Sequence, residues 1–409
     1  MIHVQSLLKR HGPGLLLATA AALLLSAPQP AHAQTETLLY SFCPQPNCAD
    51  GSSPWAGLLM DRAGNLYGTT VYGGEYDCGT VFKLTPTGTE TVVYSFNPNG
   101  APGDGFQPYA GLVMDRKGNL YGTTLYGGAD NYGTVFKVTP TGAETVLYSF
   151  NPDGVPGDGF HPYAGLILDS ADNLYGTTEY GGANGDGTVF KVTPRGTETV
   201  LYSFGSQSGD GINPYAGLLM DKQGNLYGTT LYGGANNLGT VFKLTSSGTE
   251  TVLYSFSPYG DDGHEPYAGV IMDKLGNLYG TTELGGRGEV VGTVFELTPA
   301  GVETVLYSFT GGYTDGEQPY SGLVMGKKGK LYGASSHGQS PNYGALFELS
   351  PPSRKKGPWT FTSLHAFNSG NGDGIEPYGT PILDIEGNLY GTTYVGGAYN
   401  QGTVWRVTP

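Results

Sequence analysis

A motif of the form Asp-Gly-x-x-Pro-aromatic occurs seven times in the chain and combines carboxylates with aromatic rings. Carboxylate oxygens suit Ca²⁺, and aromatic faces suit sugar rings, so the motif could form a rim for cations or polyhydroxylated ligands. A simpler interpretation is that each carboxylate accepts backbone N–H groups in a turn, because a catalytic site needs to occur only once. The first copy holds Asp50 and Trp55, and the candidate rim residues of the other six are Asp104, Tyr109, Asp158, Tyr163, Asp210, Tyr215, Asp262, Tyr267, Asp315, Tyr320, Asp373 and Tyr378.

One stretch of the chain is unusually basic. Six of the 18 Lys and Arg residues that follow residue 33 fall between positions 327 and 356. They occupy two loops of one repeat, so they should form one basic patch on an acidic protein. The patch could dock an anionic glycan or envelope lipid headgroups, and the alternative is a pair of solvated turns. Its residues are Lys327, Lys328, Lys330, Arg354, Lys355 and Lys356.

Residues for nucleophilic catalysis are sparse. Ser336 and His337 are adjacent in the same basic repeat, and His161 and His264 lie in Asp-Gly motifs of other repeats. No G-x-S-x-G elbow is present, and scattered His residues on loops are usually solvated. We therefore predict no catalytic residue.

The three cysteines of the chain, Cys43, Cys48 and Cys78, lie close together in the sequence. A disulfide is favoured over a metal site, because no His is near and a zinc site needs about four ligands. The spacing leaves open whether Cys48 pairs with Cys43 or with Cys78. No EF-hand loop is present, so we predict no metal and no cofactor, with calcium at the rim as the alternative.

All these residues belong to a repeat of roughly fifty residues. The motif Tyr-Gly-Thr-Thr, or a variant, recurs at spacings of 52 to 58 residues. Each repeat also has three apolar motifs, which we call words: the first precedes Tyr-Gly-Thr-Thr, as at 110–115 (AGLVMD), and the third and fourth follow it, as at 133–139 (GTVFKVT) and 144–150 (ETVLYSF). Their β-branched and aromatic content predicts four short strands per repeat, joined by turns rich in Pro and Gly. The Tyr-Gly-Thr-Thr motif begins at Tyr67, Tyr121, Tyr175, Tyr227, Tyr279, Tyr332 and Tyr390.

The two ends of the chain are out of phase with the repeat, and this predicts a closed ring. Residues 36–42 (ETLLYSF) match the fourth strand of the repeat, but no first, second or third strand precedes them. Residues 402–408 (GTVWRVT) match the third strand, but no fourth strand follows them. The two halves complete one repeat, so we predict an all-β, seven-bladed β-propeller with four antiparallel strands per blade, a single domain over residues 34–409. A linear solenoid would need polar capping repeats, and the sequence has none.

Chain topology then assigns the loops to two faces. The Ala-Gly opening of the first word suits the crowded axis, so the first strand is innermost and the fourth is outermost. The outer-to-inner connections, which hold the Asp-Gly motif, share one face with the second-to-third hairpins, and we call this face the top. The turns with the basic residues lie on the bottom.

The words G-N-L-Y-G-T-T, Y-G-G-A-x-x-x-G-T-V-F-K and T-x-T-V-L-Y-S-F resemble the tandem repeat named GloVer, which is found in secreted and surface proteins of bacteria. The resemblance covers essentially all of residues 34–409. It implies a propeller-like repeat and no particular activity.

Residues 1–33 have the pattern of a secretory signal, with Lys9 and Arg10 before an apolar stretch at 15–25 and a small-x-small cleavage pattern that ends at Ala33. Its removal takes the net charge from −15 to −17, which argues against nucleic acid as a partner. We expect a monomer without a transmembrane segment, released into the periplasm or outside the cell. The leading interpretation is a non-catalytic binding or scaffold propeller for a glycan or an envelope component. The alternatives are a glycan-directed lyase or hydrolase and a structural or adhesive envelope protein.

Overall fold

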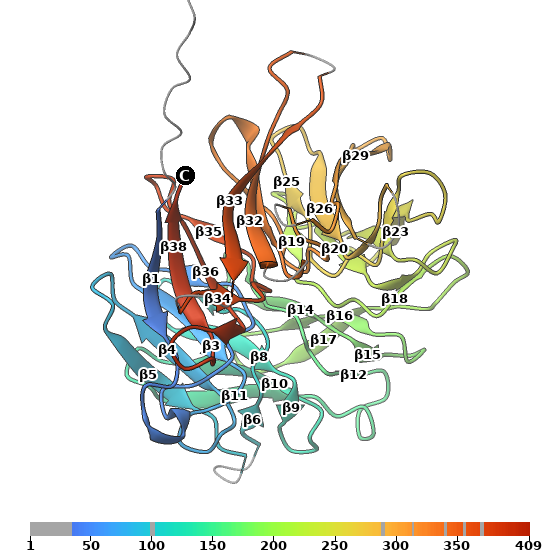
Figure 1. Ribbon diagram of the computed structural model, residues 1–409. Coiled ribbons are helices and arrows are strands. Elements are labelled where there is room, and N and C mark those ends of the chain that lie inside the picture. Colours follow the sequence, from blue (N-terminus) through green and yellow to red (C-terminus); the bar gives the residue numbers. More distant parts are fainter. Residues whose placement is uncertain are drawn as a thin grey trace, which may run out of the picture. The chain divides into compact units, whose positions relative to one another are not determined.

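The computed structural model describes residues 35–98, 103–287, 291–312, 315–338, 342–354, 357–368 and 372–409. Residues 34–409 form one compact unit, in which seven four-stranded antiparallel sheets stand as the blades of a ring (Figure 1). The predicted seven-bladed β-propeller is confirmed. The predicted signal lies outside the described residues.

Each blade runs from an inner strand of two residues to an outer strand of six to nine residues. Blades 1 to 3 consist of β2 (Leu59–Met60), β3 (Leu66–Thr70), β4 (Thr80–Leu84) and β5 (Glu90–Ser95); β7 (Val113–Met114), β8 (Leu120–Thr124), β10 (Thr134–Val138) and β11 (Glu144–Ser149); and β13 (Ile167–Leu168), β14 (Leu174–Thr178), β16 (Thr188–Val192) and β17 (Glu198–Ser203). Blades 4 and 5 consist of β19 (Leu219–Met220), β20 (Leu226–Thr230), β22 (Thr240–Leu244) and β23 (Glu250–Ser255); and β25 (Ile271–Met272), β26 (Leu278–Thr282), β28 (Thr293–Leu297) and β29 (Glu303–Ser308). Blades 6 and 7 consist of β30 (Val324–Met325), β31 (Leu331–Ser335), β32 (Asn342–Ser350) and β33 (Thr360–Asn368); and β35 (Ile382–Leu383), β36 (Leu389–Thr393), β38 (Thr403–Thr408) and β1 (Thr35–Ser41).

Short elements decorate the blade loops. In five blades the connection into the inner strand pairs with the second-to-third hairpin of the same blade, which confirms that both lie on one face. These ladders are β6 (Gly105–Phe106) with β9 (Tyr126–Gly127), β12 (Gly159–Phe160) with β15 (Tyr180–Gly181), β18 (Gly211–Ile212) with β21 (Tyr232–Gly233), β24 (Gly263–His264) with β27 (Leu284–Gly285), and β34 (Gly374–Ile375) with β37 (Val395–Gly396). Single turns of 3₁₀ helix form η1 (Pro46–Cys48) and η2 (Lys327–Gly329).

The ring is closed by the N-terminal strand, as the phase of the two chain ends predicts. β1 pairs antiparallel with β38, with Thr37 opposite Arg406. The Phe42 backbone N–H donates to the Gly402 carbonyl at 3.0 Å, and the fully buried Phe42 ring packs edge-on against Phe82 of blade 1. β1 therefore completes blade 7 and covers the side of blade 1.

Small residues let the inner ends of the blades converge at the axis. A Cβ atom on Gly57 would lie only 2.5 Å from the Thr380 carbonyl oxygen of the neighbouring blade. Hydroxyl groups also tie adjacent blades together, since Thr123 Oγ1 donates to the Ala164 carbonyl oxygen of the next blade at 3.0 Å. The Ala-Gly word is thus innermost.

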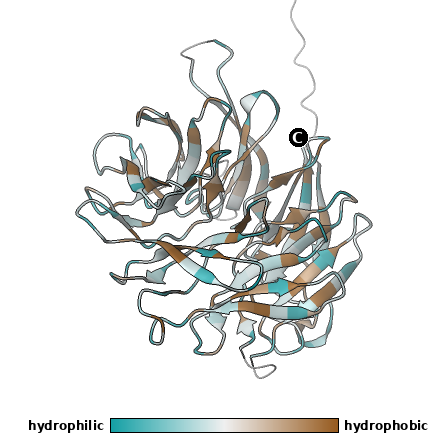
Figure 2. Ribbon diagram, turned by 180° about the vertical axis from the view of Figure 1, so that it is seen from behind, coloured by the Kyte–Doolittle hydropathy of each residue, from teal (hydrophilic) through white to brown (hydrophobic). Residues whose placement is uncertain are grey.

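The glycine of the Tyr-Gly-Thr-Thr motif makes room for an aromatic ring from the neighbouring strand. A Cβ atom on Gly122 would lie 2.6 Å from Cζ of Phe136, whose ring is buried and packs on Phe96 of the preceding blade at 5.1 Å. The core of the propeller is built from such contacts between blades. Figure 2 shows hydrophobic residues on many of the strands and hydrophilic residues on many loops.

Gly122→Ala is expected to lower the free energy of unfolding by about 1–3 kcal/mol, because the added methyl group overpacks the Phe136 pocket. Gly154→Ala is the matched control: its Cβ would meet only the amide of Asn151 in an exposed turn, so a change within about 0.5 kcal/mol is expected. Urea unfolding followed by circular dichroism measures both. Equal losses in the two variants would contradict this account of the core.

Candidate functional site

The aspartate of each Asp-Gly motif holds a turn beneath the top face. Asp104 is 5% exposed, and its Oδ2 atom accepts hydrogen bonds from the Tyr94 hydroxyl and the Asn97 backbone N–H, both at 2.8 Å. Burial raises the pKa of Asp104, and these hydrogen bonds oppose the rise. The carboxylates therefore do not form the open rim that a calcium site would need. Equivalent hydrogen bonds join Tyr40 to Asp50, Tyr148 to Asp158, Tyr202 to Asp210, Tyr254 to Asp262 and Tyr307 to Asp315.

The aromatic residues of the same motif contact one another in a circle on the top face. Neighbouring rings contact each other around the whole circle, and Trp55 also reaches Tyr163 across it, with ring centroids 6.4 Å apart. All seven rings are half-buried. Successive pairs, with their centroid distances, are Trp55–Tyr109 (5.6 Å), Tyr109–Tyr163 (4.9 Å), Tyr163–Tyr215 (4.2 Å), Tyr215–Tyr267 (4.6 Å), Tyr267–Tyr320 (4.7 Å), Tyr320–Tyr378 (5.6 Å) and Tyr378–Trp55 (4.0 Å).

Polar groups lie beside this aromatic ring on blades 5 to 7. Glu283 Oε1 accepts hydrogen bonds from the Tyr320 hydroxyl at 2.6 Å and from Gln318 Nε2 at 3.2 Å. Burial raises the pKa of Glu283, although the hydrogen bond from Tyr320 opposes this. His337 Nε2 lies 3.4 Å from the Tyr378 hydroxyl.

The Ser336 and His337 pair is not arranged for nucleophilic catalysis. Ser336 is fully buried, and its hydroxyl donates to the Pro377 carbonyl oxygen at 3.2 Å. His161 and His264 lie at separate top connections, and burial lowers the pKa of both imidazoles. A nucleophile needs an exposed oxygen beside a base, and Ser336 has no such exposure.

On the bottom face, six blades turn between their first two strands around one carboxylate. Asp115 accepts hydrogen bonds from the backbone N–H groups of Lys117 (2.8 Å) and Asn119 (2.9 Å), from the Asn119 amide (2.6 Å) and from the Tyr121 hydroxyl (3.0 Å). Burial opposes the effect, but these bonds hold the pKa of Asp115 below its ordinary value. The equivalent carboxylates are Asp61, Asp169, Asp221, Asp273 and Asp384.

Blade 6 replaces this carboxylate turn with a basic one. Gly326 and Lys330 stand where the other blades have Asp and Asn, and η2 forms between them. Lys330 Nζ makes an ion pair with Glu348 Oε1 at 2.7 Å. Lys327 Nζ donates to the Ile385 carbonyl oxygen of blade 7 at 3.3 Å. The basic turn therefore bridges two blades.

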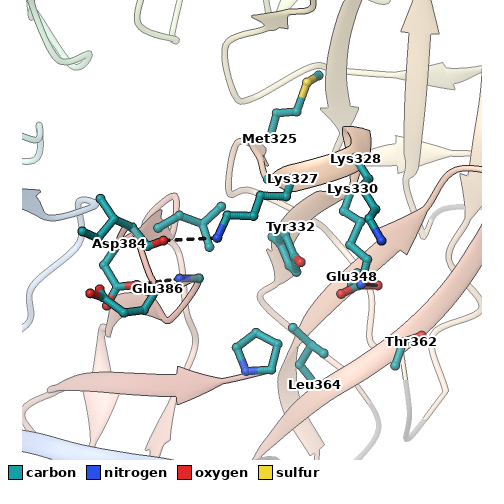
Figure 3. Close-up of a pocket in the computed structure, with 15 residues that line it drawn as sticks. Met325, Lys327, Lys328, Lys330, Tyr332, Glu348, Thr362, Leu364, Asp384 and Glu386 are labelled. Carbon is teal, nitrogen blue, oxygen red and sulfur yellow. Dashed lines mark hydrogen bonds and ion pairs between the residues drawn. The ribbon is translucent and has the colours of Figure 1, made fainter.

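A groove of about 820 Å³ runs between blades 6 and 7 beside this turn (Figure 3). Apolar side chains line part of it, including Tyr332 and Leu364. Three lysines and three carboxylates also line it, so the groove is mixed in charge rather than purely basic. These residues are Lys327, Lys328, Lys330, Glu348, Asp384 and Glu386.

The groove contains only part of the predicted basic patch. Lys327 and Lys328 are exposed at its edge. Arg354 is exposed but is not among the residues that line the groove. Lys355 and Lys356 lie outside the described residues. Sequence reasoning missed Glu348 and Asp384, because both lie at ordinary positions of the repeat and only the fold brings them beside the lysines.

The cysteine pairing that the sequence left open is Cys43 with Cys48, which closes the loop after β1. Cys78 keeps a free, half-buried thiol. Burial raises the pKa of this thiol.

Seven blades built from one repeated sequence define this protein as a repeat-built β-propeller. The chain belongs to the Gloeobacter/Verrucomicrobia repeat family, whose model matches residues 27–167, 155–325 and 290–409. The GloVer resemblance is therefore confirmed. No curated protein sequence matches the chain.

Several solved structures share the fold at low sequence identity. The extracellular domain of a putative hybrid two-component system from B. thetaiotaomicron is 14% identical, with a TM-score of 0.55, and the match covers 92% of this chain and 41% of that one. PorZ, a surface component of the type-IX secretion system of Porphyromonas gingivalis, is 13% identical, with a TM-score of 0.52 and coverage of 86% and 46%. A puromycin-hydrolyzing peptidase of Mycobacterium tuberculosis is 14% identical, with a TM-score of 0.52 and coverage of 90% and 54%. The chain thus spans about half the length of these proteins or less, and the likeness is one of fold.

Proposed function

We propose that this protein is a secreted, non-catalytic binding propeller whose groove between blades 6 and 7 docks an anionic glycan of the cell envelope. The observation that carries the proposal is the groove itself, which lies beside the one blade whose bottom turn has Gly326 and Lys330 in place of the Asp and Asn of the other blades. Among the described residues, no helix is long and apolar enough to cross a bilayer. The signal pattern of residues 1–33, with cleavage after Ala33, supports export.

The lining of the groove suits a charged sugar. Tyr332 and Leu364 line the groove with apolar surface, and the exposed Glu386 offers oxygen atoms that accept hydrogen bonds from hydroxyl groups. Lys327 and Lys328 add the positive charge that an acidic substituent would need. Ligand sites commonly combine an apolar lining with a few placed polar groups in this way.

The ionic state of the groove favours binding over catalysis. Although burial opposes it, hydrogen bonds from Asn388 and the Asn388 backbone hold the pKa of Asp384 below its ordinary value. Glu348 likewise has a lowered pKa, because the ion pair with Lys330 and a hydrogen bond from Ser350 outweigh its burial. A general acid needs a raised pKa, so neither carboxyl fits that role.

The second candidate is a glycan-directed lyase or hydrolase that uses the top face. It is favoured by Glu283, whose carboxyl has a raised pKa and lies 2.6 Å from the Tyr320 hydroxyl. Incubation of a bound polysaccharide with the protein distinguishes the two functions, because only an enzyme releases shorter chains.

Replacing two lysines tests the proposed function. Lys327→Ser with Lys328→Ser should weaken binding of the protein to alginate, an acidic polysaccharide, by roughly thirtyfold, since each exposed basic residue contributes roughly 1 kcal/mol near an anionic surface. The matched control is Arg116→Ser with Lys117→Ser, because these two residues occupy the same exposed turn positions in blade 2. Affinity chromatography with a salt gradient measures the change.

The proposal requires that the blade 6 variant elutes at lower salt than the native protein and that the blade 2 variant does not. An equal shift of both variants would mean that alginate senses only overall charge. Absence of retention of the native protein on any acidic polysaccharide would also contradict the proposal.

A further inference from the structure

A carboxyl pair lies at most seams between neighbouring blades. At the seam of blades 1 and 2, Glu144 at the start of β11 is close enough to Asp104 for their charges to interact, and the Tyr94 hydroxyl donates to Asp104. Both Glu144 Oε1 and Asp104 Oδ1 are buried without a hydrogen-bond partner. The repeat therefore places unpaired carboxylate oxygens at this seam.

The seam of blades 6 and 7 differs from this pattern by one residue. His365 of β33 stands where the other outer strands have Tyr, and its Nε2 atom lies 3.1 Å from Asp373 Oδ2. Glu36 of β1 completes the cluster, and one ligand atom from each of the three residues lies within 4.8 Å of the others. Three separate segments thus bring an imidazole and two carboxylates together.

The cluster contains oxygen atoms whose hydrogen-bonding capacity is not used. Glu36 Oε1 and Asp373 Oδ1 are buried without a hydrogen-bond partner among the described residues, and the Asp373 side chain is only 9% exposed. A buried carboxylate oxygen without a partner is costly, and a bound cation removes that cost. Carboxylates with an unpaired oxygen, gathered around an imidazole, supply the ligand types that a metal ion requires.

We propose that Glu36, His365 and Asp373 bind a divalent transition metal, of which Zn²⁺ fits best. Zn²⁺ takes imidazole nitrogen and carboxylate oxygen as ligands, and a water molecule can fill a fourth position. Ca²⁺ fits less well, because it takes six to eight ligands that are all oxygen atoms. The metal would link β1, the strand that closes the ring, to the neighbouring blade 6. The sequence predicted no metal, because Glu36 and His365 are far apart in the chain.

Metal analysis of three variants tests the proposal. The protein of residues 34–409, with Cys78→Ser to remove the free thiol, is stripped with EDTA, dialysed against ZnCl₂ and analysed by mass spectrometry for metal. About one equivalent of zinc is expected, with a rise in the thermal midpoint on zinc addition. His365→Tyr restores the residue of the other seams, so it should fold normally and lose both the zinc and the rise.

Tyr94→His provides the reverse experiment, because it places an imidazole beside Glu144 and Asp104 at another seam. This variant should gain a second equivalent of zinc. Unchanged zinc content in His365→Tyr would overturn the proposal, as would the absence of zinc from the native protein. The glycan proposal does not depend on this result, since the groove and the metal site share no residue.

Discussion

Deletion of residues 34–42 is expected to abolish cooperative unfolding of the protein. The deletion removes β1, leaves β38 as an open edge and uncovers the side of blade 1 that the fully buried Phe42 packs against. Truncation of one buried Phe already costs about 3–5 kcal/mol, and whole domains are stable by only about 5–15 kcal/mol. Loss of the entire strand therefore exceeds what the ring can tolerate.

Scanning calorimetry of two proteins that begin at Gln34 and at Cys43 measures this effect. The first should show one sharp transition, and the second should show none or should aggregate. A cross-link gives the converse test, because Arg406 Nη2 lies 3.4 Å from Thr37 Oγ1. Thr37→Cys with Arg406→Cys, in a Cys78→Ser background, should raise the midpoint under oxidising conditions. A truncated protein as stable as the longer one would contradict ring closure by β1.

The stability of the protein should fall as the pH rises from about 4.5 to about 7. Five glutamates of the outer strands have a pKa raised to about 7. The larger cause is burial, and the second is the charge of a nearby Asp, such as Asp104 beside Glu144. The folded state therefore holds more protons than the unfolded state in this interval, and the free energy of unfolding falls as they dissociate. We expect roughly 1 kcal/mol per glutamate, less than the full linkage value because these side chains are partly exposed. The residues are Glu90, Glu144, Glu198, Glu250 and Glu303.

The bottom-turn carboxylates act in the opposite direction. The pKa of Asp115 is held below its ordinary value, so the stability that it contributes is present above about pH 4 and is lost as the pH falls further. The two sets together predict maximal stability near pH 4 to 5.

Thermal midpoints between pH 4 and pH 8 test this profile. Replacement of three glutamates by Gln, as Glu90→Gln with Glu144→Gln and Glu198→Gln, should flatten the profile and raise the midpoint at pH 8. At pH 4.5 the variant and the native protein should be nearly equal. A native midpoint that rises between pH 4.5 and pH 7 would contradict the assignment of raised pKa values to these side chains.

The sequence predicts the strands well wherever a strand hydrogen-bonds along its whole length to neighbours in its own blade. The predicted segment 133–139 contains β10, and the predicted segment 144–150 contains β11. The inner strand is shorter than the predicted segment, since only Val113–Met114 of residues 110–115 form β7. The Ala-Gly part instead lies at the axis, where backbones of neighbouring blades meet and no ladder forms.

The candidate site is predicted less completely, because it depends on contacts between blades. The change from Asp to Gly at position 326 and the lysines after it are visible in the sequence, but the ion pair of Lys330 with Glu348 is not. The cluster of Glu36, His365 and Asp373 is assembled only when the ring closes. A single His in place of the repeated Tyr is the one signal that points to it.

Hydrogen exchange with and without a retained acidic polysaccharide tests most directly whether the groove is the binding site. The account predicts slower exchange at residues 325–332 and 383–387, which border the groove, and unchanged exchange at the top connection around residues 104–109. Protection confined to the top connections and the aromatic ring, with none at the groove, would contradict it.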